Sequence, residues 1–174
     1  MPRPLPLAAI SLLLCAFQCE RQYEGPDIDF GPDAGLTYRD AQGRLLRPAD
    51  PTDWTSDATW NEQELHTLPG ATNGPQQPGA VSQSLAYPNA GQVGQVSWYF
   101  KLSATAPCPC RVYAQLVNKR YSEADVYTAD LAAGDSLQFA PKVYDTGQRY
   151  RLYYLLSNAT GLLYKGHGDL RFTP

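Results

Sequence analysis

Residues 95–102 read QVSWYFKL, and the alternation of apolar and polar side chains in this stretch decides the fold class. Side chains of a β-strand point to opposite faces in turn, so a period of two predicts a strand with one face in a core. The residues expected on that face are Val96, Trp98, Phe100 and Leu102. Residues 110–117, CRVYAQLV, repeat the pattern, with expected core residues Cys110, Val112, Ala114 and Leu116.

Short apolar segments continue after these two strands, separated mostly by Gly, Asn or Asp. They are residues 125–131, 136–141, 148–156, 161–166 and 169–173. Several short strands at this spacing predict a mainly β fold, an antiparallel β-sandwich. The expected core face of QRYRLYYLL, residues 148–156, consists of Tyr150, Leu152, Tyr154 and Leu156. Leu155 on the other face indicates that this strand is central or partly covered.

A resemblance to a known family extends over residues 85–174. It is carried by AYPNAGQVGQVSWYFKL (86–102), CRVYAQLVNKR (110–120), LAAGDSLQF (131–139) and TGQRYRLYY (146–154). This part of the chain resembles the C-terminal sorting domain of type IX secretion cargo, which is a small immunoglobulin-like sandwich. The resemblance implies an immunoglobulin-like domain at residues 81–174. Ala90 instead of proline follows Asn89, and no basic tail strand ends the chain, so we infer the fold and no sorting function.

Residues 36–80 are expected to add a hairpin, one short helix and a loop. In LTYRDAQGRLLR (36–47), two short runs flank a turn in which Gly43 is able to take a positive φ. Thr59 and Glu62 have the spacing of a capping box, which predicts a helix that ends before Pro69. The loop follows at residues 70–80.

The N-terminus predicts export from the cytoplasm. Arg3 precedes an apolar run at residues 5–17, which is typical of a secretory signal, and we assign residues 1–18 to a signal peptide. This run is shorter than the ~20 residues that a membrane-spanning helix needs. Residues 19–35, rich in Gly, Pro and Asp, are expected to form a flexible tether.

Cys19 is the expected lipid anchor. The segment CERQYEGPDIDFGPD (19–33) and the run before it resemble the start of Bacteroidota-type outer-membrane lipoproteins, although Phe17 and Gln18 are larger than usual. The resemblance implies a chain bound to the outer membrane through a lipid on Cys19, on its periplasmic or surface face. The alternative is ordinary secretion with Cys19 as a free thiol. The net charge of −3 gives no sign of a nucleic-acid partner.

Cys108 and Cys110, in APCPCRV, are predicted to form a reducible disulfide in an oxidising compartment. Their Cα atoms are roughly 6.6 Å apart in an extended strand, whereas a disulfide prefers about 5.5 Å, so a straight strand strains the bridge. Pro107 and Pro109 are able to bend the segment. The alternatives are two buried free thiols, a redox-active pair, and a thiolate site for a soft metal such as copper(I).

The binding candidates are aromatic side chains, because the sequence contains no familiar catalytic or cofactor-binding motif. Trp54, Tyr99, Tyr113 and Tyr153 are candidates for stacking on sugar rings, although plain packing is the preferred interpretation of the aromatic residues. His66 and His167 lie on segments expected to be exposed and match no zinc spacing. We therefore expect no metal and no cofactor.

The function expected from these patterns is non-catalytic. The sequence predicts a structural or interaction module of the cell envelope, whose partner is an envelope protein or a glycan. One alternative is a glycan-binding surface lipoprotein that uses exposed aromatic residues. A weaker alternative is a hydrolase with a carboxylate pair assembled in the folded chain.

Overall fold

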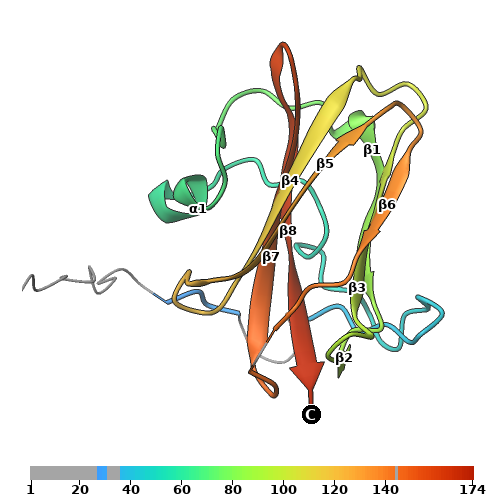
Figure 1. The fold of residues 1–174 in the computed structure, drawn as a ribbon, viewed down its shortest axis with the longest axis vertical. Helices are drawn as coiled ribbons and strands as arrows, with labels where there is room; N and C mark the ends of the chain where they lie inside the picture. Colours follow the sequence, from blue (N-terminus) through green and yellow to red (C-terminus); the bar gives the residue numbers. More distant parts are fainter. Residues whose placement is uncertain (1–26, 31–35, 144) are drawn as a thin grey trace, which may run out of the picture.

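The computed structural model describes residues 27–30, 36–143 and 145–174, so the expected signal peptide, Cys19 and most of the tether lie outside it. The strands of the described residues form two sheets (Figure 1). The first sheet has the order β1-β3-β6, from strands Val81–Tyr87, Ser97–Leu102 and Ser136–Phe139. The second has the order β2-β8-β7-β4-β5, from strands Gly91–Gln92, Gly161–Thr173, Arg149–Asn158, Cys110–Val117 and Glu123–Leu131.

The two sheets pack face to face, which confirms the predicted mainly β sandwich. Neighbouring strands run antiparallel, apart from the short β2–β8 pair. The helices of the described residues are α1 (Glu62–Thr67) and the 3-10 helix η2 (Pro78–Ala80). No helix in these residues is long and apolar enough to cross a membrane. The immunoglobulin-like type of the sandwich stays a prediction.

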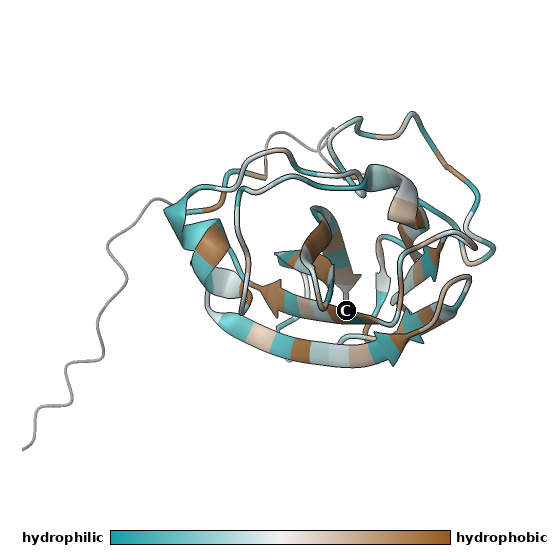
Figure 2. Ribbon diagram, turned by 90° about the horizontal axis from the view of Figure 1, so that it is seen from above, coloured by the Kyte–Doolittle hydropathy of each residue, from teal (hydrophilic) through white to brown (hydrophobic). Residues whose placement is uncertain are grey.

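The core between the sheets contains the residues that the period of two predicts. The three expected core residues of β3 are buried, as is Val96 directly before it, and so are all four of β4. Tyr150, Leu152, Tyr154 and Leu156 of β7 are buried too. Apolar and polar residues alternate along the strands in Figure 2. Trp98, Phe100 and Tyr154 form an aromatic centre, with ring centroids 5.0 to 5.7 Å apart.

A second apolar cluster covers the outer face of the five-stranded sheet. Its buried members are Ile28, Trp60, Leu68, Val117, Tyr153 and Leu155. The chain around α1 lies over the outer side of β7 and contributes Trp60 and Leu68 (Figure 1). Strand β7 is therefore buried on both faces, which confirms the interpretation of Leu155 as a sign of a covered strand.

Residues 53–57 protect the edge of β8. The Trp54 N–H donates to the His167 carbonyl, and the Asp57 N–H donates to the Lys165 carbonyl. Farther along the strand, the Gln77 N–H donates to the carbonyl of Leu163. An unpaired edge exposes backbone groups that attract other strands, and this segment satisfies them within the chain.

The segment before the sandwich agrees with the predicted hairpin and corrects the start of the helix. A bridge joins Arg39 and Leu45 across a turn in which Gly43 has a φ of 77°. The capping box uses Asn61 and Glu64, two positions after the predicted pair of Thr59 and Glu62. The amide oxygen of Asn61 accepts from two N–H groups of the first turn, and Asn is a stronger N-cap than Thr.

Residues 27–30 differ from the flexible tether to which the sequence assigned them. Ile28 is 6% exposed, and its N–H donates to the Lys119 carbonyl at 2.7 Å. The Phe30 carbonyl accepts a hydrogen bond from Arg149, and the Arg151 guanidinium lies over the Phe30 ring. Two apolar side chains among the acidic residues thus find partners on the sandwich, which composition alone does not reveal.

Candidate functional site

The four aromatic binding candidates do not form one site. Trp54 is 8% exposed and Tyr153 is 0% exposed, so neither offers a ring to a ligand. Tyr99 and Tyr113 are half-buried on the outward faces of β3 and β4, which belong to different sheets. The sandwich therefore separates the two remaining rings, so the four aromatic residues do not form a shared platform.

Trp54 is buried because glycines make room for it at β8. A Cβ atom at Gly168 would overlap the indole ring, so only glycine fits there. The ring stacks at 6.4 Å on Tyr154 of the core. Trp54 holds a positive φ of 65°, and its N–H pairs with β8. Its role is to fasten the N-terminal segment to the sandwich.

Tyr153 points outward from β7, as predicted, and is covered by α1 and its flanks. Its ring meets Trp60 edge-on at 5.2 Å and stacks on Tyr121 at 6.2 Å. Its hydroxyl donates to Glu64 Oε1 at 3.0 Å, and burial raises the pKa of the phenol. The preferred interpretation of Trp60 as a packing residue is confirmed by its 2% exposure.

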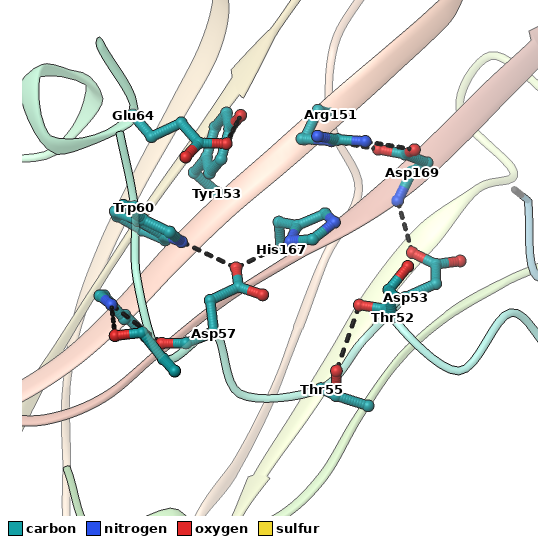
Figure 3. A network of polar contacts seen from close by, with 12 residues as sticks. Thr52, Asp53, Thr55, Asp57, Trp60, Glu64, Arg151, Tyr153, His167 and Asp169 are labelled. Atoms are coloured by element: carbon teal, nitrogen blue, oxygen red, sulfur yellow. Dashed lines mark hydrogen bonds and ion pairs between the residues drawn. The ribbon is translucent and has the colours of Figure 1, made fainter. Parts of the chain in front are cut away.

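A polar network joins the same segment to β8 (Figure 3). Asp57 Oδ2 accepts a hydrogen bond from Trp60 Nε1 at 2.7 Å and lies 2.7 Å from His167 Nδ1. The Lys165 ammonium donates to the carbonyls of Asp57 and Ala58, and burial lowers its pKa. The expectation that His167 is exposed is wrong, because it lies within β8 and only 15% of its side chain is accessible.

A second polar chain lies farther along β8 (Figure 3). Arg151 binds both carboxylate oxygens of Asp169, at 2.6 and 2.8 Å. The Asp169 N–H donates to Asp53 Oδ1, while the Thr37 N–H donates to Asp53 Oδ2. Burial, together with the nearby charge of Asp169, raises the pKa of Asp53 to about 6. These groups hold together segments that are far apart in the sequence.

Cys108 and Cys110 form a disulfide, as the preferred interpretation predicts. Their Cα atoms are 4.4 Å apart, much less than the roughly 6.6 Å of an extended strand. The segment is therefore bent before β4 begins at Cys110. In the described residues no three His, Cys, Asp or Glu side chains gather as a metal site would require.

Two hollows open on the outer face of the five-stranded sheet. The first, of about 460 Å³, lies between α1 and β4 and is lined by Glu62, Gln63, His66, Thr67, Gln115 and Tyr121. The second, of about 300 Å³, lies beside the disulfide, and its lining includes Cys110, Arg111, Tyr113, Asp130 and Asn158. Of the four aromatic binding candidates, Tyr113 is the one that lines either of these two hollows.

Gln115 and Tyr121 were missed by sequence reasoning for different reasons. Gln115 has the outward phase of Tyr113, which was visible in the alternation of β4, but glutamine is common on any exposed strand face. Tyr121 lies in the turn after β4 with a φ of 58°, where no periodic pattern places a side chain. His66, expected to be exposed, is exposed on α1 and lines the first hollow.

A third hollow, of about 570 Å³, lies at the end of the sandwich where residues 27–30 pack. It is lined by Phe30, Lys119, Gln148 and Arg149. Lys119 forms an ion pair with Asp27 at 3.3 Å, and Arg149 donates to the Phe30 carbonyl. Both cations thus help to hold the segment in place.

Comparisons with protein families, with curated proteins and with solved structures found no match.

Proposed function

We propose that this protein is a non-catalytic interaction module of the cell envelope, held at the outer membrane by a lipid on Cys19. The observation that carries the proposal is how the buried ionisable groups are used. Asp53, Asp57 and Lys165 make hydrogen bonds that join the N-terminal segment to the sandwich, and the Asp169 carboxylate binds Arg151 of the adjacent strand. Their chemistry supports rigidity rather than proton transfer.

The buried carboxylates argue against the weaker alternative, a hydrolase. A glycosidase needs two carboxylates that face a substrate, one of them with a raised pKa. Asp53 has the raised pKa, and Asp169 is its close neighbour. Both oxygens of Asp53 accept backbone N–H groups, and both oxygens of Asp169 accept from Arg151. Neither residue lines any of the three hollows described above.

The packing of residues 27–30 fits a domain displayed from a membrane. Eight residue steps separate Cys19 from Asp27, so this stretch spans at most about 29 Å. Ile28 is fixed beside Lys119, at the end of the sheet where β4 stops and β7 starts. A lipid on Cys19 would therefore keep that end near the bilayer. The other end, with the disulfide and Asn158, would face away.

The test is the intact mass and cell fraction of the native protein, with a Cys19→Ala variant as the control. We expect the wild-type chain in the outer-membrane fraction, beginning at Cys19 and carrying added acyl mass. The Cys19→Ala chain should lack that mass and leave the membrane fraction. An unmodified wild-type chain in the medium would refute the anchor and support the alternative of ordinary secretion.

A further inference from the structure

We propose that the outer face of β4 is the floor of a groove that binds a neutral carbohydrate chain. This inference rests on the proposed function, since it names the ligand class of the interaction module. It is carried by the two hollows on the outer face of the five-stranded sheet, each of which is lined in part by outward residues of this one strand.

The floor joins the two hollows. Arg111 and Tyr113 line the hollow beside the disulfide, and Gln115 lines the hollow beside α1. Alternate residues of a strand point to the same side about 6.6 Å apart, so the floor extends about 13 Å from Arg111 to Gln115. The volumes of about 300 and 460 Å³ at its ends give an elongated site suited to a chain molecule.

The covering segment leaves this strip open. Trp60 and Glu64 lie on Tyr153 of β7, which is fully buried, whereas Tyr113 of the adjacent β4 is half-buried. On the other side, β5 opposes Tyr113 with the exposed Thr128. The strip is therefore bordered by the covering segment around α1 on one side and only by exposed side chains of β5 on the other.

The position of the floor disfavours an extended peptide that binds by strand addition. That mode needs a sheet edge with unpaired N–H and C=O groups. Strand β4 is interior and pairs with β5 on one side and β7 on the other. Only side chains are left to recognise a ligand on its outer face.

The charges of the groove favour an uncharged ligand. The Arg111 guanidinium is held by both oxygens of Asp130, at 2.6 and 2.9 Å, so its charge is matched within the site. Glu62 lines the α1 end and would repel an anion. No lysine lines either of these two hollows. A polyanion would thus find little attraction here.

The remaining groups suit a polyhydroxylated ring. The amides of Gln63 and Gln115 each donate and accept hydrogen bonds, as a sugar hydroxyl does. Tyr113 and Tyr121 are half-buried, so their rings offer flat apolar surface for the C–H face of a sugar. Tyr121 stacks on the buried Tyr153, which fixes its ring before a ligand arrives.

Isothermal titration of the full lipidated protein, in a detergent without a sugar headgroup, tests the proposal. The probes are soluble mannan, xylan, dextran and a mixed-linkage β-glucan, with polygalacturonate as the anionic comparison. We expect at least one neutral polysaccharide to bind, with an affinity that changes little between 50 and 500 mM salt because no ion pair is involved. Flat heats for every neutral probe, or binding of polygalacturonate alone, would overturn the proposal.

Matched variants locate the site. We expect Tyr113→Ala and, separately, Gln115→Ala to weaken binding about tenfold or more, as the loss of a stacking ring or a paired amide predicts. Tyr99→Ala, a half-buried tyrosine of the opposite sheet, should leave the affinity unchanged. Equal losses at Tyr99 and Tyr113 would refute the placement. Thermal unfolding checks each variant's fold, and Gln115→Ala still tests the site if Tyr113→Ala is unstable.

The lipid anchor and the carbohydrate groove can each be refuted without refuting the other. An acylated wild-type chain that binds none of the polysaccharides refutes the groove and leaves the anchored module standing. A chain without acyl mass that still binds a neutral polysaccharide through Tyr113 refutes the anchor and supports the groove.

Discussion

The protein is expected to lose stability as pH rises through the titration of Asp53, and Asp53→Asn is expected to remove that loss. Asp53 is 6% exposed, and burial raises the pKa of its carboxyl from 3.8 to about 6. Between these pH values the folded chain holds a proton that the unfolded chain has released. Since the folded state then binds more protons, the free energy of unfolding falls as pH rises.

The size of the effect follows from the pKa. Each pKa unit corresponds to about 1.4 kcal/mol, so a rise from 3.8 to about 6 makes the contribution of Asp53 about 3 kcal/mol less favourable at pH 7 than at pH 3. An asparagine does not titrate. It also has a single acceptor oxygen for the two N–H groups of Thr37 and Asp169, so one of them loses its partner. This loss lowers the free energy of unfolding by about 1–3 kcal/mol at every pH.

The assay is urea unfolding of the wild type and Asp53→Asn from pH 3 to pH 7. We expect the wild type to be more stable than Asp53→Asn by about 1–3 kcal/mol at the acid end. Toward pH 7 the wild type should lose about 3 kcal/mol relative to the variant, so the variant becomes equally stable or more stable there. Asp40→Asn is the control, because a hydrogen bond from the Arg44 N–H lowers the pKa of the half-buried Asp40. A lowered pKa makes the contribution of Asp40 to stability rise with pH, opposite to that of Asp53. If the stability of the wild type relative to Asp53→Asn stays constant or increases with pH, the reasoning about Asp53 is refuted.

Three further substitutions test the packing of the N-terminal segment. Trp60→Ala should lower the free energy of unfolding by about 3–5 kcal/mol in urea titrations, because it removes a buried indole from the second cluster; a loss under about 1 kcal/mol would contradict its packing role. Asn89→Ala should lower the free energy of unfolding by about 3 kcal/mol, since two backbone carbonyls and one N–H lose their partner in a buried site. An unchanged urea midpoint would argue against these hydrogen bonds. Gly168→Ala should displace the Trp54 ring and lower the melting temperature, and an unaltered near-ultraviolet spectrum would show that the ring is not confined.

Local pairs were predictable to different degrees. Cys108 and Cys110 are two positions apart, so their disulfide needed only a bend in the chain. The capping box was ambiguous, because Thr59 with Glu62 and Asn61 with Glu64 have the same spacing. The structure uses the second pair, next to the Trp60 N–H, which donates to the amide of Asn73. A contact 13 positions away is invisible to a search for local motifs.

By itself, the sequence determined that the chain forms a β-sandwich and which residues of β3, β4 and β7 face its core. A period of two is a local property, and burying one face of each strand leaves little freedom in the outcome. The tertiary structure alone decided which outward faces remain open. Tyr113 and Tyr153 have the same outward phase on adjacent strands, yet Glu64, 89 positions before Tyr153, covers only the latter. Long-range contacts decide burial on an outer face, because alternation shows the direction of a side chain and not what lies above it.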